Sequence, residues 1–177
     1  MLLRQKEDIK KWLKTYDIQN TFLVKDDFYG YVVNVLSNVN LNNKNLKTLE
    51  VKFNEIHGSF DIKNNYLTNF EGFPEIVHRN LNVFNNKITS LKNATKKIEG
   101  LFHLSNNELT IEGLNNLDFV VKSDIIFLKN NKFLEKFQEI EKFSKLKESL
   151  LIYRENENIL NSINKNNLNK NKIINKI

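Results

Sequence analysis

The sequence predicts an α/β solenoid, in which about five short coils with parallel strands stack between a cap at each end. Two observations lead to this prediction: a pattern of apolar residues and asparagine recurs at a 21-residue step, and amphipathic helical periodicity flanks the recurring segment on both sides. We expect a helix and hairpin cap at 1–36, the coils at 37–133, and a helical cap with a basic tail at 134–177.

Each copy of the repeat reads apolar, any, apolar, any, Asn. The closing Asn stands at positions 43, 64, 85, 106 and 130, so the step is 21 residues three times and then 24. Apolar residues at i and i+2 place two side chains on one face of a short strand. A third apolar residue follows three positions after each Asn, and one coil buries too little surface alone, so neighbouring coils must stack. These third positions are Leu46, Leu67, Ile88, Leu109 and Phe133.

A second Asn directly follows the recurring one in four copies. An amide side chain offers two donors and an acceptor, so it can satisfy the inward-facing backbone groups of the turn. We expect these residues to form a buried ladder along the solenoid, with a less regular turn in the first copy, which has Lys44 instead. The ladder residues are Asn65, Asn86, Asn107 and Asn131.

These motifs resemble the leucine-rich-repeat core Leu-x-Leu-x-x-Asn-x-Leu. More narrowly, Gly58 to Gly72, with the sequence GSFDIKNNYLTNFEG, is similar to a short-repeat class common in bacteriophage and mobile-element genomes. The segment 20–35 resembles the N-terminal hairpin of that class. The sequence departs from the class at Arg79, where neighbouring copies have Gly58 and Gly100, and in the delayed fifth copy.

Helical caps are expected at both ends of the coils, because a solenoid needs its apolar ends covered. Apolar residues recur at three and four from Ile9 to Tyr16 and include Trp12, the only tryptophan. The same periodicity runs from Phe137 to Tyr153. Its role is open between capping and docking on a partner. The chain beyond Asn164 is rich in asparagine and lysine, a composition that favours disorder.

No credible catalytic set is found in the sequence, so we expect a protein that is not an enzyme and has no cofactor. There is no Gly-rich phosphate loop, nucleophile elbow or metal-spaced His pair on a helix. His57 and His78 are 21 residues apart and could lie about 5 Å from each other on adjacent coils. Zinc usually requires three protein ligands, and with no third ligand seen in register, no metal site is predicted.

The residues between the apolar pairs of each strand should line the outer face of the sheet. We take this face as the candidate partner-binding surface. Large aromatic side chains on a solvated sheet are costly unless covered, so Phe84 and Phe127 are either covered by a terminal helix, displaced by a local slip in register, or used in binding. The candidate residues are Asp61, Lys63, Asn82, Phe84, His103, Ser105, Phe127 and Lys129.

The function expected from these observations is binding of a protein partner. The phage-like resemblance implies a stoichiometric inhibitor or adaptor acting on a host protein, with a defence nuclease, the target of anti-CRISPR proteins, as one example. The alternative is a nucleic-acid-binding accessory protein that uses Lys63, Arg79, Lys129 and the basic tail, with Phe84 and Phe127 stacking on bases. A third hypothesis is a purely structural role, such as a scaffold in a particle.

Charge and composition indicate the cellular compartment in which the chain is expected to act. The formal charge is +6, and four lysines without an acid lie between 164 and 177, at Lys165, Lys170, Lys172 and Lys176. No cysteine, signal-peptide pattern or long apolar run is present. We therefore expect a cytoplasmic protein that is not embedded in a membrane.

Overall fold

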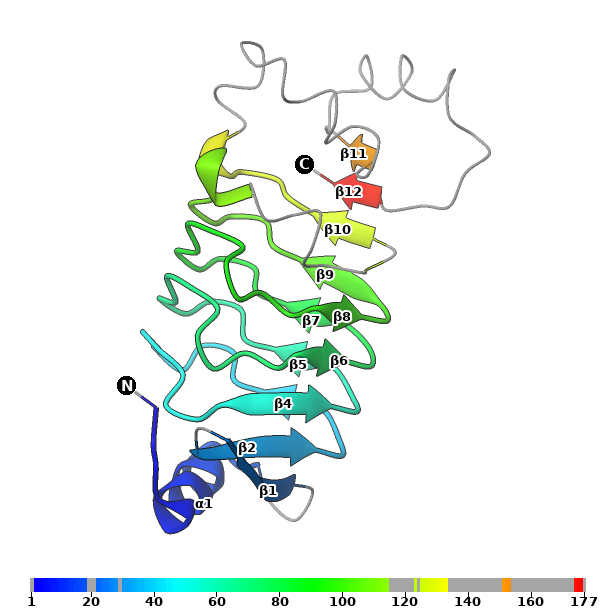
Figure 1. The fold of residues 1–177 in the computed structure, drawn as a ribbon. Coiled ribbons are helices and arrows are strands. Elements are labelled where there is room, and N and C mark those ends of the chain that lie inside the picture. The colour runs from blue at the N-terminus through cyan, green and yellow to red at the C-terminus, as the bar shows by residue number, and fades with distance from the viewer. Residues whose placement is uncertain are drawn as a thin grey trace.

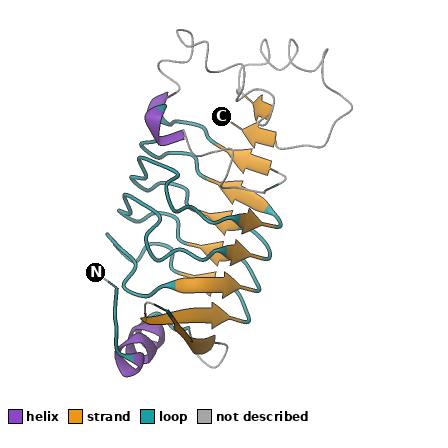
Figure 2. Cartoon of the chain, viewed as in Figure 1, coloured by secondary structure: helices purple, strands orange, loops and turns teal. Residues whose placement is uncertain are grey.

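The computed structural model describes residues 2–18, 22–28, 30–114, 123, 125–133, 151–153 and 174–176. In these ranges the chain forms a β-solenoid of about four turns that begins with one helix (Figures 1 and 2). The described elements, in chain order, are α1 (Lys6–Thr15), β1 (Phe22–Asp27), β2 (Gly30–Val35), β3 (Val39–Asn40), β4 (Phe53–Ile56), β5 (Phe60–Asp61), β6 (Ile76–Val77), β7 (Leu81–Asn82), β8 (Lys97–Ile98), β9 (Leu101–His103), the 3-10 helix η1 (Glu112–Leu114), β10 (Ile125–Phe127), β11 (Leu151–Tyr153) and β12 (Ile174–Lys176).

Two sheets run along the solenoid. Sheet A has the strand order β1-β2-β4-β6-β8, and sheet B has the order β11-β12-β10-β9-β7-β5-β3. Every described strand pair is parallel except the β1–β2 hairpin, which is antiparallel. Each complete coil therefore contributes one strand to sheet B and one to sheet A, joined by a tight connection such as that between β4 and β5 (Figure 1).

The 21-residue step appears directly as strand register. Phe60 pairs with Leu81, and Leu81 pairs with Phe102 in the next coil. Ile126 pairs with Phe102 across the longer step of 24 residues, so the delayed fifth copy keeps its register on sheet B. The structure has about four turns, so the predicted count of about five coils is not confirmed.

The buried asparagine ladder is confirmed. Asn86 is 7% exposed, and its amide nitrogen donates to the carbonyl oxygens of Ile62 at 3.0 Å and Val83 at 3.2 Å. Its Oδ1 accepts the backbone N–H of Leu67 at 3.1 Å, so one side chain bonds to its own coil and the coil before it. Asn65, Asn107 and Asn131 repeat this geometry.

The recurring Asn that precedes each ladder position has a different function, which is conformational. Asn43, Asn64, Asn85, Asn106 and Asn130 all have φ between 54° and 56°. Asparagine tolerates this left-handed region better than most residues that carry a Cβ. In the first copy Asn45 also has a positive φ, of 57°, so the turn that contains Lys44 differs from the others as expected.

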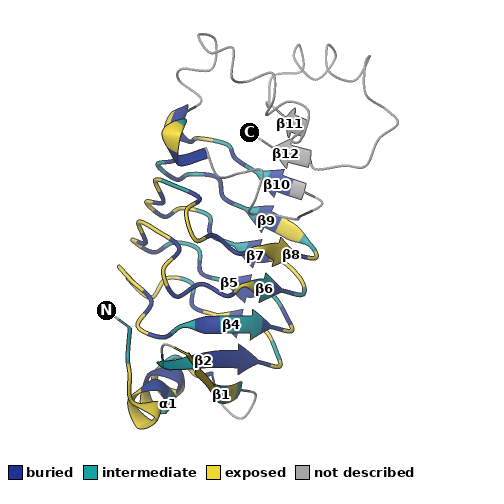
Figure 3. Cartoon of the chain, in the orientation of Figure 1, coloured by how far each residue is buried: buried dark blue, intermediate teal, exposed yellow. Residues whose placement is uncertain are grey.

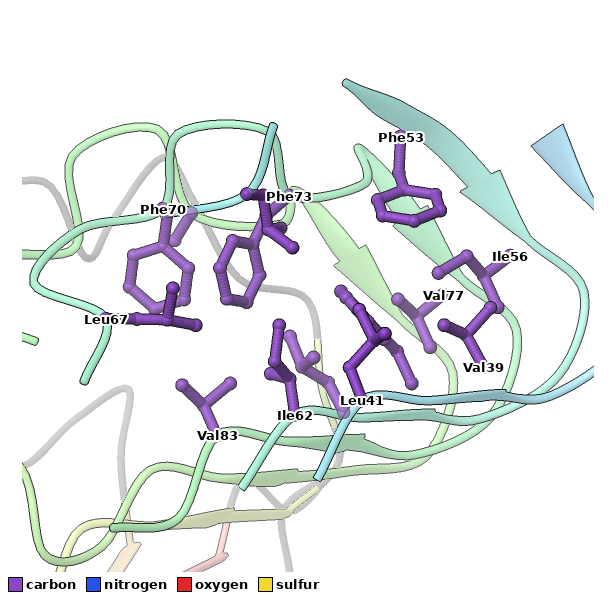
Figure 4. Close-up of a cluster of buried hydrophobic side chains, with 14 of the residues drawn as sticks. Val39, Leu41, Phe53, Ile56, Ile62, Leu67, Phe70, Phe73, Val77 and Val83 are labelled. Carbon is purple, nitrogen blue, oxygen red and sulfur yellow. The ribbon is translucent and has the colours of Figure 1, made fainter. Parts of the chain in front are cut away.

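Aromatic side chains fill much of the core between the two sheets (Figure 4). Phe60 lies 5.5 Å from Phe53 and 5.6 Å from Phe73, ring centroid to centroid, and all three are buried. Phe70 extends the row, at 4.8 Å from Phe73 and 6.3 Å from Phe102. The apolar positions of successive coils thus form one continuous core, and Figure 3 shows buried stretches in β2 and β4 among the stacked strands.

The N-terminal cap is confirmed. Helix α1 buries Ile9, Trp12 and Leu13 against the first coil. The Trp12 ring is 6.3 Å from the buried Phe53 ring, and the backbone N–H of Leu3 donates to the Glu50 carbonyl. The β1–β2 hairpin then joins sheet A, because β2 pairs with β4.

Sheet A is the part of the coil that the repeat pattern did not predict. Strand β4 has the burial order buried, half-buried, half-buried, buried, so its apolar residues Phe53 and Ile56 are three positions apart and not two. Strands β6 and β8 have two residues each. Neither case shows the alternation by which a strand is recognised in a sequence.

Arg79 stands where the neighbouring coils have glycine, and the residue one coil below it also differs. A Cβ at Gly100 would lie 2.5 Å from Asn80 Oδ1, and one at Gly58 would lie 2.6 Å from the Asn38 backbone nitrogen. Both glycines therefore rest on an asparagine. One coil below Arg79 the corresponding residue is Ser59, whose side chain is smaller than that of asparagine.

The C-terminal helical cap is not confirmed. Helical periodicity predicted a helix that includes Tyr153, but Leu151–Tyr153 is strand β11, which pairs in parallel with β12. Strand β12 in turn pairs with β10, so sheet B continues past the last repeat. Most of the predicted helix, 134–150, lies outside the described residues. No described helix is both long and apolar enough to cross a bilayer.

Candidate functional site

The predicted partner-binding residues lie in two rows across sheet B. Strand register places Asp61, Asn82, His103 and Phe127 side by side in the first row. The second row lies two residues further along the chain from the first in each coil, and it consists of Lys63, Phe84, Ser105 and Lys129. Side chains two residues apart point to the same face of a strand, so both rows belong to one surface, and we call it the sheet B face.

Three aromatic side chains meet on the sheet B face. The His103 ring lies 5.0 Å from the Phe84 ring and 5.2 Å from the Phe127 ring, measured between centroids. The interplanar angles are 41° and 59°, which are tilted contacts. All three side chains are half-buried, so each keeps part of its surface in solvent. We call this group the aromatic cluster.

The aromatic cluster has low charge. Burial lowers the pKa of His103, and the nearby Lys63 ammonium lowers it further, while Asp61 opposes both effects. The neutral imidazole is therefore the favoured form near neutral pH. The exposed part of the cluster presents three uncharged rings.

The polar residues beside the cluster are largely engaged with their own strands. Asp61 Oδ1 accepts the backbone N–H of Lys63 at 3.2 Å, and its Oδ2 lies 3.3 Å from Lys63 Nζ. Asn82 Oδ1 accepts the backbone N–H of Phe84 at 3.1 Å. The Asp61–Lys63 ion pair reduces the net positive charge at this end of the sheet B face.

Ser105 does not line the surface as expected. Its side chain is 3% exposed, and Oγ accepts the backbone N–H of Lys129 at 3.0 Å. This hydroxyl joins the fourth and fifth copies of the repeat, where the step lengthens from 21 to 24 residues. Lys129 itself is half-buried, so the second row is less open than the strand alternation implies.

The N-terminal helix does not cover Phe84 or Phe127. Helix α1 packs at the beginning of the solenoid beside β1 and β2, whereas β9 and β10 lie toward the other end (Figure 1). A slip in register is also excluded, since Phe127 pairs with His103 as the repeat requires. The other terminal helix that was considered as a cover for Phe84 and Phe127 falls mostly on residues 134–150, which lie outside the described residues.

A second group of functional side chains lies on sheet A and was not predicted. The stacked rings of His57 and His78 have centroids 4.9 Å apart, as the spacing of 21 residues indicated. Glu55 Oε1 lies 2.7 Å from His78 Nε2 and 3.7 Å from His57 Nε2. Glu99 Oε2 lies 3.1 Å from His78 Nδ1. We call these four residues the His–Glu cluster.

Hydrogen bonding between the members of the His–Glu cluster shifts their pKa values. The bond to Glu55 raises the pKa of His78, with a further contribution from Glu99. The bond to His78 lowers the pKa of Glu55. The pKa of Glu99 is lowered mainly by its hydrogen bond to Lys97 and then by His78.

The sequence contained a signal for this cluster. Continuing the 21-residue step from His57 and His78 leads to Glu99, and moving two residues back from His57 leads to Glu55 in β4. The expectation of no third ligand in register was therefore wrong, since Glu99 stands at the next step. One donor atom each from Glu55, His57 and His78 lies within 4.8 Å of the other two, the only such set among the described residues.

Several other lysines on the described surface are paired with acids. Lys52 lies 2.9 Å from Asp27, and Lys96 lies 2.8 Å from Glu75. Lys132 lies 2.6 Å from Glu108. The basic tail that motivated the nucleic-acid alternative is mostly outside the described residues; of its lysines only Lys176 is placed, in β12.

Comparison with known proteins adds no relative. No protein-family model, curated protein or solved structure matches this chain significantly.

Proposed function

We propose that this chain is a non-enzymatic protein-binding module that uses the sheet B face. The aromatic cluster carries the proposal: the His103 ring lies 5.0 Å from the Phe84 ring and 5.2 Å from the Phe127 ring, and all three side chains remain partly in solvent. Aromatic side chains at the centre of a surface with polar residues at its rim are typical of protein–protein hot spots.

The electrostatics of the sheet B face favour a protein over nucleic acid. Nucleic-acid binding draws most of its affinity from lysines and arginines that contact phosphates. On this face Asp61 lies 3.3 Å from Lys63 Nζ, and a carboxylate there would repel a phosphate. The uncharged aromatic cluster instead suits an apolar side chain of a partner protein, with Asn82 and Lys129 at its rim.

We propose the leucine-rich-repeat class as the family of this solenoid. The 21-residue step and the buried asparagine at each turn support the assignment. So does the resemblance of the segment 58–72 to short repeats of bacteriophage and mobile elements. With that resemblance comes the finer proposal of a stoichiometric inhibitor or adaptor of a host protein, for which a defence nuclease is one candidate.

Partner capture from a host lysate, with and without nuclease, tests the proposed function. We expect one stoichiometric protein that survives nuclease treatment and is lost with Phe84→Arg or Phe127→Arg. A charged residue in a desolvated hot spot should weaken binding at least about tenfold. Tyr66→Arg is the matched control, because Tyr66 is an aromatic residue 47% exposed that lies outside the sheet B face.

The purified partner then allows a direct affinity measurement. Equal binding by the wild type and the two Phe variants, with the fold intact by circular dichroism, would rule out the sheet B face. Capture that disappears with nuclease and weakens steeply with salt would instead establish the nucleic-acid alternative.

A further inference from the structure

We propose that the His–Glu cluster on sheet A binds a divalent transition metal ion of the zinc class, with Glu55, His57 and His78 as ligands and Glu99 as the residue that orients His78. The site is separate from the sheet B face and independent of the function proposed for it.

The types of donor fit zinc. Two imidazole nitrogens and one carboxylate oxygen form a ligand set that zinc uses when three protein ligands leave one position for water. Calcium and magnesium prefer oxygen ligands alone, so the two histidines select against both. No cysteine is present in the chain to offer a competing thiolate site.

The distances from Glu55 to the two histidines fit as well. Two ligand atoms of a tetrahedral zinc ion, each about 2.0–2.1 Å from the metal, lie about 3.3 Å from each other. The separations of Glu55 Oε1 from His78 Nε2 and His57 Nε2 are 2.7 and 3.7 Å, which bracket this value. The His57 side chain is 45% exposed, so it can rotate to complete the site without disturbing the core.

Glu99 supplies an arrangement that is common around zinc. A metal-bound histidine usually donates its other ring N–H to a carboxylate, which fixes its orientation and makes it a stronger ligand. His78 Nε2 lies 2.7 Å from Glu55 Oε1, and its Nδ1 lies 3.1 Å from Glu99 Oε2. Lys97 pairs with Glu99 in turn and holds that carboxylate in place.

The position of the site suggests a structural consequence. Glu55 lies in β4 and His57 directly follows it, whereas His78 follows β6 in the next coil. A bound ion would therefore join two adjacent coils of sheet A. Because an ion that binds only the folded state stabilises it, zinc should raise the unfolding temperature.

Titration of the untagged, full-length, metal-free chain with Zn²⁺ in competition with a chromophoric chelator tests the site. We expect one Zn²⁺ per chain and a higher unfolding temperature. With Co²⁺ as the probe we expect the visible absorption of a tetrahedral ion. Glu55→Gln and His57→Ala should each weaken binding at least about tenfold, and Glu99→Gln about ten- to a hundredfold, as expected for an orienting carboxylate.

His103→Ala is the matched control, because it removes the chain's remaining histidine, which lies on sheet B. It should leave zinc affinity unchanged. Absence of stoichiometric binding in the wild type, or wild-type affinity in His57→Ala, would overturn the proposal and leave the cluster as an ion-pair network. His57 is exposed and its contacts are within the cluster, so this variant should fold.

Discussion

Asn86 is the residue whose replacement tests the solenoid most directly. Asn86→Ala removes the acceptor for the Leu67 N–H and a donor to the carbonyl oxygens of Ile62 and Val83. The residues that carry these three backbone groups are at most 1% exposed, so water cannot easily replace the lost amide.

The size of the effect follows from these lost bonds. One orphaned N–H costs about 1–3 kcal/mol, and two carbonyl groups that each lose a partner cost about 0.5–1.5 kcal/mol apiece. The sum is about 2–6 kcal/mol, which is a large part of a typical folding free energy of about 5–15 kcal/mol. We therefore expect a marked loss of stability from a single exchange.

Urea unfolding followed by far-UV circular dichroism measures this loss. The matched control is Asn85→Gly, which keeps the left-handed φ of 54° and removes only an exposed amide bond to Asn64. We expect a change of less than about 1 kcal/mol for the control. Hydrogen exchange should also show faster exchange of the Leu67 amide in Asn86→Ala. A loss below about 1 kcal/mol, equal to that of the control, would refute the role of the ladder.

Three further predictions concern other parts of the molecule. Gly100→Ala should destabilise by about 1–3 kcal/mol in urea unfolding because its Cβ would press on Asn80, whereas Arg79→Ala should stay within about 0.5 kcal/mol; equal effects would contradict the stacking argument. His103 should titrate below its usual pKa by NMR, since burial disfavours its charged form. Its contribution to stability is present above pH about 6.5 and should be lost as pH falls through the folded-state pKa; a pKa above 6.5 would reverse the sign. Trp12→Ala should cost about 3–5 kcal/mol, because the ring is 7% exposed in the N-terminal cap, and an unchanged urea midpoint would show that the cap contributes little.

Much of the fold could be predicted from the repeat in the sequence. The register of sheet B and the buried asparagine ladder both follow from the repeat step, which persists despite irregular residues in single copies. The ladder consists of Asn65, Asn86, Asn107 and Asn131. The N-terminal helix was readable from its own periodicity. In both cases the signal repeats several times within the chain, so one irregular residue does not remove it.

The positions of the candidate residues were harder to predict. The sequence placed Phe84, His103 and Phe127 on one face, but the diagonal contact between Phe84 and His103 depends on ring orientation and on the twist of the sheet. Ser105 was expected on the same face and is buried, because its hydroxyl bonds to the Lys129 N–H of the next strand. Alternation along a strand predicts the face to which a side chain points, but the exposure of that side chain also depends on the residues of the neighbouring strand.

By itself the sequence determined the period, the inward-facing residues of sheet B and the turn asparagines, because each of these depends on spacing along the chain. The tertiary structure alone decided that a second sheet exists and how close Glu55 and Glu99 come to His78 upon it. The physical reason is strand length. A two-residue strand such as β6 shows no alternation of its own, and it becomes a strand only when its neighbours β4 and β8 supply hydrogen-bond partners.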